Sequence, residues 1–431
     1  MRGGMDILIS HFSKIGIWKK INTHLGNRSP RAEYRNDEVL QTWVINALSG
    51  SNRLEHSQSN RLSLLSHPKL NKGISPDTIS RVFKSWATDN IYFSKGEGRH
   101  KNAPLDKDEY LRMPPEEKLK AHEVNINDKL NDLLIDTVIN LGLLEIGKEY
   151  ILDVDASIIE TRVSDSRPHY KRTGVGYCPV FALLGGVPIY LEARNGNSNA
   201  VFRLKTVIKA AVELAESRGL KIKFVRSDAA GSVPVTIGYL IKNKINFIIR
   251  AHGAFTKNND GHRPWKEYTG ETSHIHSFAN SQLKLNDEYV RLLWYNATFK
   301  SSRPGSKLDG RKKIFGILTS FEDLNESEIV KLYNQRGGME QVFSYLNDLG
   351  MKYMPHRELK YNTVFMIVTL ISYTFFLYAK KYLGTKLPFV KDNMEPRTFI
   401  KAFIEVITKW HGRGLRFYTR AEQFRIFSGV P

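Results

Sequence analysis

The sequence is nearly free of cysteine: Cys178 is the only one among 431 residues. A single thiol excludes an internal disulfide framework and any zinc site built from several cysteines, and it suits a reducing cytosol. Cys178 lies inside an apolar run, so we expect no nucleophilic thiol chemistry from it. Internal repeats, low-complexity segments and a glycine-rich nucleotide-binding loop after a strand are also missing.

Long hydrophobic runs are scarce as well. The N-terminal run Ile7–Ile9 is too short for a secretory signal and is followed by His11 and Lys14, so we expect no signal segment. The stretch Val364–Ala379 has 16 uncharged residues, short of the roughly 20 that a membrane-spanning helix needs. We therefore expect a buried core helix there and no membrane partner.

Acidic residues are in deficit. The chain has 64 Lys and Arg against 44 Asp and Glu, a formal net charge of +20. An excess of this size indicates a polyanionic partner, for which nucleic acid is the first interpretation and an anionic membrane surface the weaker one. With 41% hydrophobic and 25% charged residues, the composition is that of a globular protein of two to four domains.

The first region, residues 1–148, has helical patterns and a basic excess, and we interpret it as a helical DNA-binding region. Ser75-Pro76-Asp77 predicts a helix start, with a capping serine and proline in the first turn. The following helix carries apolar residues on one face and places Arg81 and Lys84 elsewhere. This pattern is typical of the recognition helix of a helix-turn-helix, and equally of an ordinary amphipathic surface helix.

The second region, residues 149–250, alternates strand and helix patterns. In order these are Tyr150–Ile159, Val175–Leu184, Val187–Ala193, a helix over Asn199–Arg218, Lys221–Ser227, a helix over Val235–Lys244, and Asn246–Arg250. Gly185-Gly186 predicts a hairpin between the second and third strands. The order β-β-β-α-β-α-β, three antiparallel strands followed by right-handed crossovers, is that of a ribonuclease-H-like α/β fold with a mixed sheet.

The remaining regions complete the expected architecture. We predict a β-rich insertion over 251–320, helices that close the core over 321–380, and a basic C-terminal helical region over 381–431. Residues 149–250 and 321–380 together form the predicted catalytic core.

Two aspartates stand where this fold would place a site. Asp155 lies in the first strand of the core and Asp228 follows the fourth, and sites form at the carboxyl ends of strands in open α/β sheets. A buried carboxylate needs a partner, and Mg²⁺ or Mn²⁺ suits hard oxygen ligands. With a third carboxylate such a pair holds two metal ions for phosphoryl transfer. Asp153 shares the strand face of Asp155, and strand position alone does not choose between them.

A helical segment supplies the third carboxylate. At about 100° per residue, Tyr333, Arg336 and Glu340 share one helix face. An ordinary surface helix with an Arg–Glu pair has the same pattern. Gly337-Gly338 disfavours a straight helix by roughly 2 kcal/mol relative to alanine, which indicates a kink or a close backbone approach.

These features together resemble bacterial insertion-sequence transposases of the DDE class, and more narrowly the cut-and-paste group with the signature Tyr-x2-Arg-x3-Glu-x6-Lys. The resemblance covers about residues 149–380. It rests on LDVDAS around Asp155, on FVRSD ending at Asp228, and on the Tyr333-to-Glu340 segment. The family pattern Asp-x-Ser/Thr selects Asp155 over Asp153.

The resemblance implies roles for these residues. Asp155, Asp228 and Glu340 would bind two Mg²⁺ (or Mn²⁺) ions that activate water or a DNA 3′-hydroxyl for attack on a phosphodiester. Tyr333 and Arg336 would hold the DNA end. The final Lys of the signature would fall at position 347, where this chain has Asn347. Lys352 is the nearest basic residue beyond it. Because the signature Lys is missing, the sequence leaves open whether a phosphate is bound there and whether a hairpin-ended intermediate forms.

The expected function is therefore a transposase that binds the terminal inverted repeats of its element and catalyses cleavage and strand transfer. Its partners would be double-stranded DNA, both repeat and target, and a second copy of the chain, in the bacterial cytoplasm near the nucleoid. Two alternatives stay open: a ribonuclease-H-like nuclease that cuts without joining, and a non-catalytic DNA-binding protein derived from a transposase.

Overall fold

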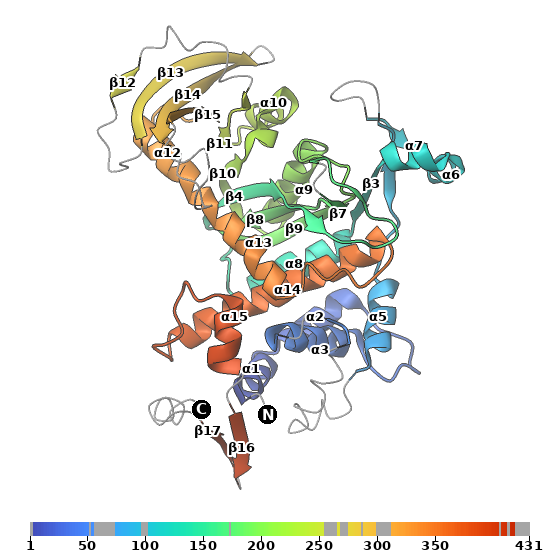
Figure 1. Cartoon of the computed structure of the whole chain (residues 1–431). Coiled ribbons are helices and arrows are strands. Elements are labelled where there is room, and N and C mark those ends of the chain that lie inside the picture. Colours follow the sequence, from blue (N-terminus) through green and yellow to red (C-terminus); the bar gives the residue numbers. More distant parts are fainter. Residues whose placement is uncertain are drawn as a thin grey trace.

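The computed structural model describes residues 3–50, 53–55, 74–95, 102–171, 174–253, 265–267, 275–285, 288–298, 312–404, 407–411 and 414–418. Its main feature is a mixed sheet of 12 strands flanked by helices (Figure 1). In spatial order the strands are β12 (Lys266–Glu267), β13 (Ile275–Leu285), β14 (Glu288–Thr298), β15 (Lys312–Thr319), β11 (Phe247–Arg250), β10 (Lys221–Ser227), β4 (Glu149–Ala156), β8 (Val180–Leu184), β9 (Val187–Arg194), β3 (His122–Ile126), β1 (Ile91–Phe93) and β2 (Pro104–Leu105). The predicted α/β class with a mixed sheet is confirmed.

The centre of the sheet combines both strand directions. Strand β10 runs parallel to β4 and β11, whereas β8 is antiparallel to β4 and β9 to β8. Helix α9 (Leu204–Ser217) leads from β9 to β10, and α10 (Pro234–Lys242) from β10 to β11. The predicted hairpin is confirmed: Gly185 and Gly186 have φ of 57° and 83° and join paired residues of β8 and β9. Residues with a Cβ atom rarely adopt positive φ angles, which explains the glycine at both positions.

The predicted strand over residues 175–184 is two strands. Strand β7 (Val175–Tyr177) pairs with β5 (Ile159–Glu160) and β6 (Arg167–Pro168) in a separate three-stranded sheet. Pro179 lies just before β8, and proline donates no ladder hydrogen bond. The chain therefore changes sheets within what looked like one apolar run.

The two faces of the sheet belong to different cores. Phe181 and Leu183 of β8 face a core with helix α14 (Leu359–Gly384), whereas the alternate residues of β8 pack with α9. Helix α14 also packs against α3 (Asn36–Leu48), α8 (Asp128–Asn140) and β9. By length and composition it is the one described helix able to cross a membrane, but 89% of its most apolar window is buried. It lies in the core, as predicted from residues 364–379 (Figure 1).

The N-terminal region is not helical throughout, contrary to the prediction. The helices described in it are α1 (Gly3–Lys14), α2 (Ile17–Leu25), α3, α5 (Pro76–Ser85), α6 (Lys107–Arg112), α7 (Pro115–Lys120) and α8. Within it, however, β3 pairs with β9 and carries the sheet on to β1 and β2. Three polar residues of β3 are buried, namely His122, Glu123 and Asn125. Their burial depends on hydrogen bonds with distant residues, so hydrophobic periodicity did not indicate this strand.

Residues 251–320 were predicted to be a β-rich insertion, and the strands described there extend the central sheet. Strands β13, β14 and β15 form an antiparallel meander, and β15 pairs with β11. Segments 254–264, 268–274 and 299–311 of this region lie outside the described residues.

In the described part of the C-terminal region, the end of α14 is followed by the short helix α15 (Pro396–Phe399), which contacts α13 (Gly338–Asp348), and by the π-helical turn η3 (Ile400–Ile404), which contacts α1. Beyond it, β16 (Ile407–His411) and β17 (Gly414–Tyr418) form a two-stranded hairpin. The helical prediction for residues 381–431 is therefore wrong for 407–418. Residues 419–431, with Arg420 and Arg425 of the basic tail, lie outside the described residues.

Candidate active site at the ends of two parallel strands

Asp155 and Asp228 occupy matching positions on neighbouring strands. In the parallel pair β4–β10, Val154 lies opposite Ser227, and the next residue on each strand is the aspartate. Residues on the same face of adjacent parallel strands lie about 5 Å apart. The predicted juxtaposition of two carboxylates at the carboxyl ends of β4 and β10 is therefore present in the structure.

The carboxylate of Asp155 is largely buried. Its side chain is 15% exposed, and one oxygen, Oδ2, lies 2.5 Å from Nη2 of Arg336. The other oxygen, Oδ1, accepts a hydrogen bond from the backbone N–H of Ala156 at 2.9 Å. Burial raises the pKa of Asp155 to about 6, and the nearby charge of Asp228 adds to the rise while Arg336 opposes it. Two close carboxylates thus share one guanidinium as counter-ion.

Asp228 is fixed by the turn that follows its strand. Its carboxylate accepts a hydrogen bond from the backbone N–H of Ala230 at 3.0 Å and caps the 3₁₀ turn η1 (Ala229–Ser232). This capping orients the carboxylate at the strand end, since a capping side chain is bound to the backbone of the turn it starts.

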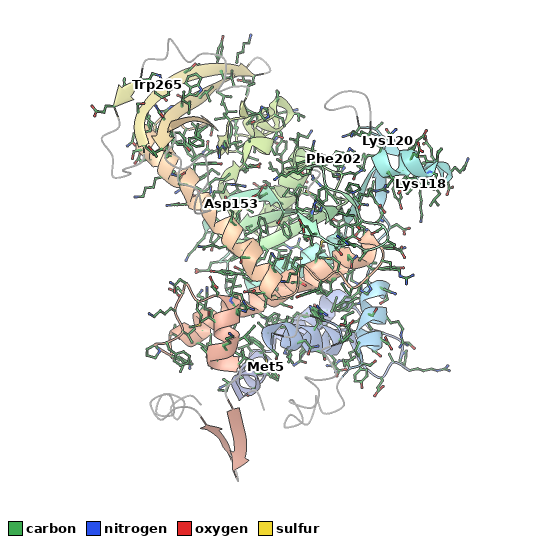
Figure 2. The ribbon with its side chains drawn as sticks, viewed as in Figure 1. Met5, Lys118, Lys120, Asp153, Phe202 and Trp265 are labelled. Atoms are coloured by element: carbon green, nitrogen blue, oxygen red, sulfur yellow. The ribbon has the colours of Figure 1, made fainter. Side chains whose placement is uncertain are left out.

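Asp153 serves a different purpose, although it shares a strand face with Asp155. Nε and Nη2 of Arg226, from the opposite position on β10, donate to its two oxygens at 2.7 and 2.8 Å. Nη1 of the same arginine donates to the backbone carbonyl of Leu332. Both side chains of the pair are 7% exposed. Asp153 therefore belongs to a buried ion pair that fixes helix α12 (Glu326–Asn334) to the sheet, and Figure 2 shows it in the middle of the molecule.

Tyr333, near the end of this helix, lies close to Asp228, and Arg336, just beyond it, lies close to both aspartates. Tyr333 is buried near the end of α12, and Arg336 lies in the 3₁₀ turn η2 (Gln335–Gly337) that follows. Burial raises the pKa of the Tyr333 phenol. The charges of Arg336 and Arg250 and a hydrogen bond with Arg250 lower this pKa and so oppose the rise. The structure therefore gathers a tyrosine and two arginines around the carboxylates.

Glu340 was predicted to be the third carboxylate, but the structure does not place it in this cluster. It is exposed, in the first turn of α13 (Gly338–Asp348). Within the described ranges, no group of three Asp, Glu, His or Cys side chains is arranged to hold a metal ion. The prediction assumed one continuous α-helix from Tyr333 to Glu340, whereas the chain passes through the 3₁₀ turn η2 between them. A 3₁₀ turn advances about 120° per residue instead of about 100°, which changes the direction of everything after it.

Two residues near the carboxylates were not predicted. Arg250 ends β11, the next parallel strand. The strand-end rule that selected Asp228 would also have selected Arg250. Tyr170 follows β6, and its pKa is raised to about 12, mainly by burial and further by Asp228 and Asp155. Its position on a loop outside the main strands left no periodic signal.

The other predicted DNA contacts are exposed and lie on separate elements. Arg81 and Lys84 lie on the solvent side of α5, whose apolar residues Ile79, Val82 and Phe83 are buried. Ser75 caps this helix by accepting a hydrogen bond from the backbone N–H of Thr78 at 3.2 Å, as the sequence predicted. Lys352 follows α13 with its ammonium 5.3 Å from the ring centre of Tyr353. Asn347 is exposed near the end of α13.

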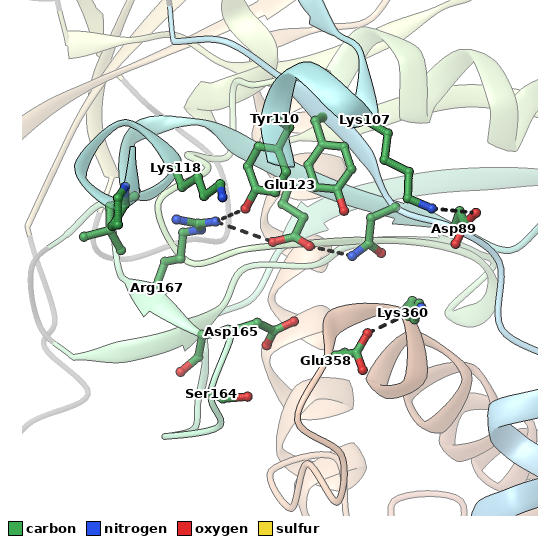
Figure 3. A pocket seen from close by; sticks show the side chains of 15 residues that line it. Asp89, Lys107, Tyr110, Lys118, Glu123, Ser164, Asp165, Arg167, Glu358 and Lys360 are labelled. Atoms are coloured by element: carbon green, nitrogen blue, oxygen red, sulfur yellow. Dashed lines mark hydrogen bonds and ion pairs between the residues drawn. The ribbon is translucent and has the colours of Figure 1, made fainter. Parts of the chain in front are cut away.

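A separate polar cleft of about 430 Å³ lies between the α6–α7 hairpin and the start of α14 (Figure 3). At its wall, Nη2 of Arg167 donates to the Tyr110 hydroxyl at 2.6 Å and lies 3.7 Å from Oε2 of Glu123. Asn90 and Asn195 donate to the same carboxylate at 2.5 and 2.7 Å. None of the predicted site residues lines this cleft, so it is distinct from the carboxylate cluster.

Comparison with known proteins identifies the family. No curated protein matches the chain. Among solved structures, a piggyBac transposase in a synaptic complex with hairpin DNA matches over 90% of this chain and 76% of that chain, with 12% identity and a TM-score of 0.42. The model of one family, described as transposase DDE domain group 1, matches residues 2–391. Because that match spans nearly the whole chain, the protein belongs to this family of DDE-domain transposases.

Proposed function

We propose that the chain is the transposase of an insertion sequence, which binds the terminal inverted repeats of its element, cleaves phosphodiester bonds there and joins the freed ends to target DNA. The family supports a DNA transposase in general. The observation that carries the finer proposal is the pair Asp155 and Asp228, placed side by side at the carboxyl ends of two parallel strands.

The sheet supports a ribonuclease-H-like core for this activity. The five strands β11-β10-β4-β8-β9 lie in this order, with β8 antiparallel and β10 and β11 parallel to β4. Strands β12–β15 would then be an insertion between β11 and α12 that lengthens the sheet. This arrangement sets the strand ends of β4, β10 and β11 beside α12.

The donor set suits a divalent metal ion. Asp155 and Asp228 offer hard oxygen ligands in a partly buried place, and burial together with Asp228 raises the pKa of Asp155 to about 6. A divalent cation relieves that repulsion and stabilises the ionised form. Asp155, Asp228 and Glu340 would hold Mg²⁺ or Mn²⁺, two ions in the complete site. The metal supplies Lewis-acid stabilisation of the phosphate and an activated hydroxyl nucleophile.

The side chains around the carboxylates are suited to a DNA backbone. The guanidinium groups of Arg250 and Arg336 match the geometry and charge of phosphate. Tyr333 forms a hydrogen bond with Arg250, and this bond helps to orient the Arg250 guanidinium. We infer that these three hold a strand against Asp155 and Asp228, and that Lys352, Arg81 and Lys84 contact the duplex farther away. The net charge of +20 supports the same partner.

Transposition requires the two ends of one element to be brought together, so we propose a homodimer on DNA. The location would be the bacterial cytoplasm near the nucleoid. A nuclease without joining activity and a non-catalytic DNA-binding descendant are the competing functions.

A plasmid joining assay separates these functions. Purified protein, DNA with the ends of the element, Mg²⁺ or Mn²⁺ and a supercoiled target plasmid are mixed, and the proposal expects end cleavage followed by joined products. Cleavage without joined products would support the nuclease, and binding without cleavage would support the non-catalytic protein. Asp228→Asn is expected to remove both products. Asp323→Asn, at an exposed loop aspartate, is the matched control.

A further inference from the structure

The loop between β6 and β7 brings Tyr170 to the edge of the sheet that carries the two aspartates. Strands β4 and β9 are both antiparallel to β8, so they run parallel to each other and their carboxyl ends lie at the same edge. Gly196 follows the end of β9, and its carbonyl oxygen accepts a hydrogen bond from the backbone N–H of Tyr170 at 2.9 Å. The backbone of Tyr170 therefore lies on the β9 side of the candidate site, and Arg250 of β11 lies on the other side.

A buried histidine fixes the position of this loop. The side chain of His169 is buried, with 1% exposure, and its backbone N–H donates to the carbonyl oxygen of Gly174 at 2.8 Å. A Cβ atom on either Gly176 or Gly196 would lie 2.8 Å from an atom of the same imidazole ring. The packing around His169 thus requires glycine at both positions, and a close-packed neighbour of this kind restricts the movement of Tyr170.

The phenol of Tyr170 lies near the carboxylates and is open to a ligand. Tyr170 is 37% exposed. Burial raises its pKa to about 12, and nearby charges that include Asp228 and Asp155 add to the rise, so the hydroxyl is protonated at neutral pH. Within the described residues this hydroxyl has no hydrogen-bond partner. It is therefore a donor beside the two aspartates that is available to a further acceptor.

Lys171 adds a positive charge to the same loop. Its ammonium lies 5.7 Å from the ring centre of Tyr170, and its side chain is exposed. At this distance the ammonium is attracted to the face of the ring, which helps to orient the phenol. The same charge attracts an anionic strand to this side of the site.

The spacing of the strands provides room for a DNA strand over the aspartates. From β11 to β9 there are four strand intervals, which together span about 19 Å. The guanidinium of Arg250 approaches from the first of these strands, and the loop of Tyr170 is bonded beyond the last. A phosphate bound at the aspartates thus has an arginine on one side and a neutral phenol on the other.

We propose that Tyr170 contacts the substrate: its hydroxyl donates a hydrogen bond to a non-bridging oxygen of the phosphate that is cleaved, from the side opposite Arg250. This inference rests on the proposed function, because it needs a phosphodiester bound at Asp155 and Asp228. Negative charge on these oxygens is stabilised most in the transition state, so the hydrogen bond contributes mainly to the rate of cleavage. A neutral donor does so without adding a cation that competes with a metal ion for the carboxylates.

The test measures the single-turnover rate at which the full-length protein cleaves bound element-end DNA in Mg²⁺. Tyr170→Phe keeps the ring and removes only the hydroxyl. We expect the rate to fall roughly 10- to 100-fold, the range for a hydrogen bond to a charged group. The DNA affinity should stay close to that of the wild type, because other phosphate contacts supply most of it. Thermal unfolding verifies that the variant is folded.

Tyr289→Phe is the matched control. Tyr289 is 67% exposed and lies at the start of β14. Because β14 and β11 are both antiparallel to β15, they run parallel to each other, and Tyr289 lies at the opposite edge of the sheet from Arg250. The control should cleave at the wild-type rate.

Sulfur substitution identifies the atom that accepts the hydrogen bond. A phosphorothioate at the cleaved bond replaces one of the two non-bridging oxygens with sulfur, a weaker acceptor. With one diastereomer we expect the wild type and Tyr170→Phe to cleave at similar rates, since the sulfur has already weakened the bond that the variant lacks. With the other diastereomer the full difference between the two proteins should persist.

Three results would overturn the proposal. A wild-type rate in Tyr170→Phe would show that the hydroxyl does not contribute. An equal loss of rate with both diastereomers and with unmodified DNA would show that Tyr170 acts elsewhere than on this phosphate. Failure of the proposed function has a different signature, because the wild type, Tyr289→Phe and Tyr170→Phe would then all bind the DNA without cleaving it.

Discussion

Asp153 and Asp155 lie two residues apart on the same strand face, yet their carboxylates have different partners. Asp153 receives two directed hydrogen bonds from Arg226, which also binds the backbone of α12. Asp155 has one ion pair, to an arginine in a 3₁₀ turn, and a second carboxylate beside it. A buried carboxylate whose partners are complete stabilises the fold. A buried carboxylate at the end of a strand that has a single ion pair and a second carboxylate beside it is a candidate for chemistry.

The largest effect that separates the two aspartates concerns activity. Asp155→Asn is expected to reduce end cleavage by at least roughly a thousandfold, because a metal ion contributes several kcal/mol of transition-state stabilisation. Folding should be preserved, because Asp228 remains as a counter-ion for Arg336 and the change also removes the repulsion between the two carboxylates. Cleavage of labelled element-end DNA measures the first effect and thermal unfolding the second. Near-wild-type cleavage by Asp155→Asn would remove it from the catalytic site.

Asp153→Asn is expected to act on stability. It leaves Arg226 buried without its counter-ion, which costs about 3–5 kcal/mol in comparable pairs. Denaturant unfolding measures the loss. The double replacement Asp153→Leu/Arg226→Met is the control, because removing both charges together should recover most of the stability. If Asp153→Asn were as stable as the wild type, the ion pair would not fix α12.

The cleft in Figure 3 gives a third buried carboxylate for comparison. Burial, with a smaller contribution from Asp165, raises the pKa of Glu123 from 4.5 to about 7. Because the folded form holds its proton more tightly than the unfolded form, stability should fall as pH rises from about 4.5 to about 7, by about 3 kcal/mol in total. Thermal unfolding of the wild type and Glu123→Gln across this range measures it. Parallel pH profiles for the two proteins would contradict the prediction.

The smallest effects concern DNA contacts far from the carboxylates. Arg81→Ala and Lys84→Ala are each expected to lower the slope of log K against log salt by about 0.9 for duplex DNA, the value for one phosphate contact. Lys209→Ala, an exposed lysine of α9 paired with Glu213, is the control and should leave the slope unchanged. An unchanged slope in both α5 variants would place the duplex elsewhere.

The sequence predicted the central strands well, because their apolar residues and turn glycines follow local rules. Strand β10 and the hairpin at Gly185-Gly186 formed where expected. Strand β3 was missed, since Glu123 and its neighbours are polar and become buried only through partners such as Asn195. Local periodicity carries no information about such distant hydrogen bonds.

The candidate site, like the fold, was predictable where local patterns determine it and not where tertiary contacts do. The strand-end positions of Asp155 and Asp228 follow from the strand pattern. The partner of Asp153 did not, because the register that places Arg226 opposite it is a tertiary property. The helix face of Glu340 was predicted from a uniform α-helix, and the 3₁₀ turn at Gln335–Gly337 changed it. The glycine pair indicated an irregularity there but not its geometry.

The assignment of Asp155, Asp228 and Glu340 to one catalytic site is tested by cleavage of labelled DNA from the two flanks of the gene in Mg²⁺ or Mn²⁺, with wild type, Glu340→Gln and Glu216→Gln side by side. Glu216 is an exposed glutamate of α9 and serves as the control. We expect cleavage at the element ends by the wild type and Glu216→Gln, and DNA binding without cleavage by Glu340→Gln. Full cleavage by Glu340→Gln would contradict the assignment of the third carboxylate, and binding without cleavage by all three proteins would contradict the transposase.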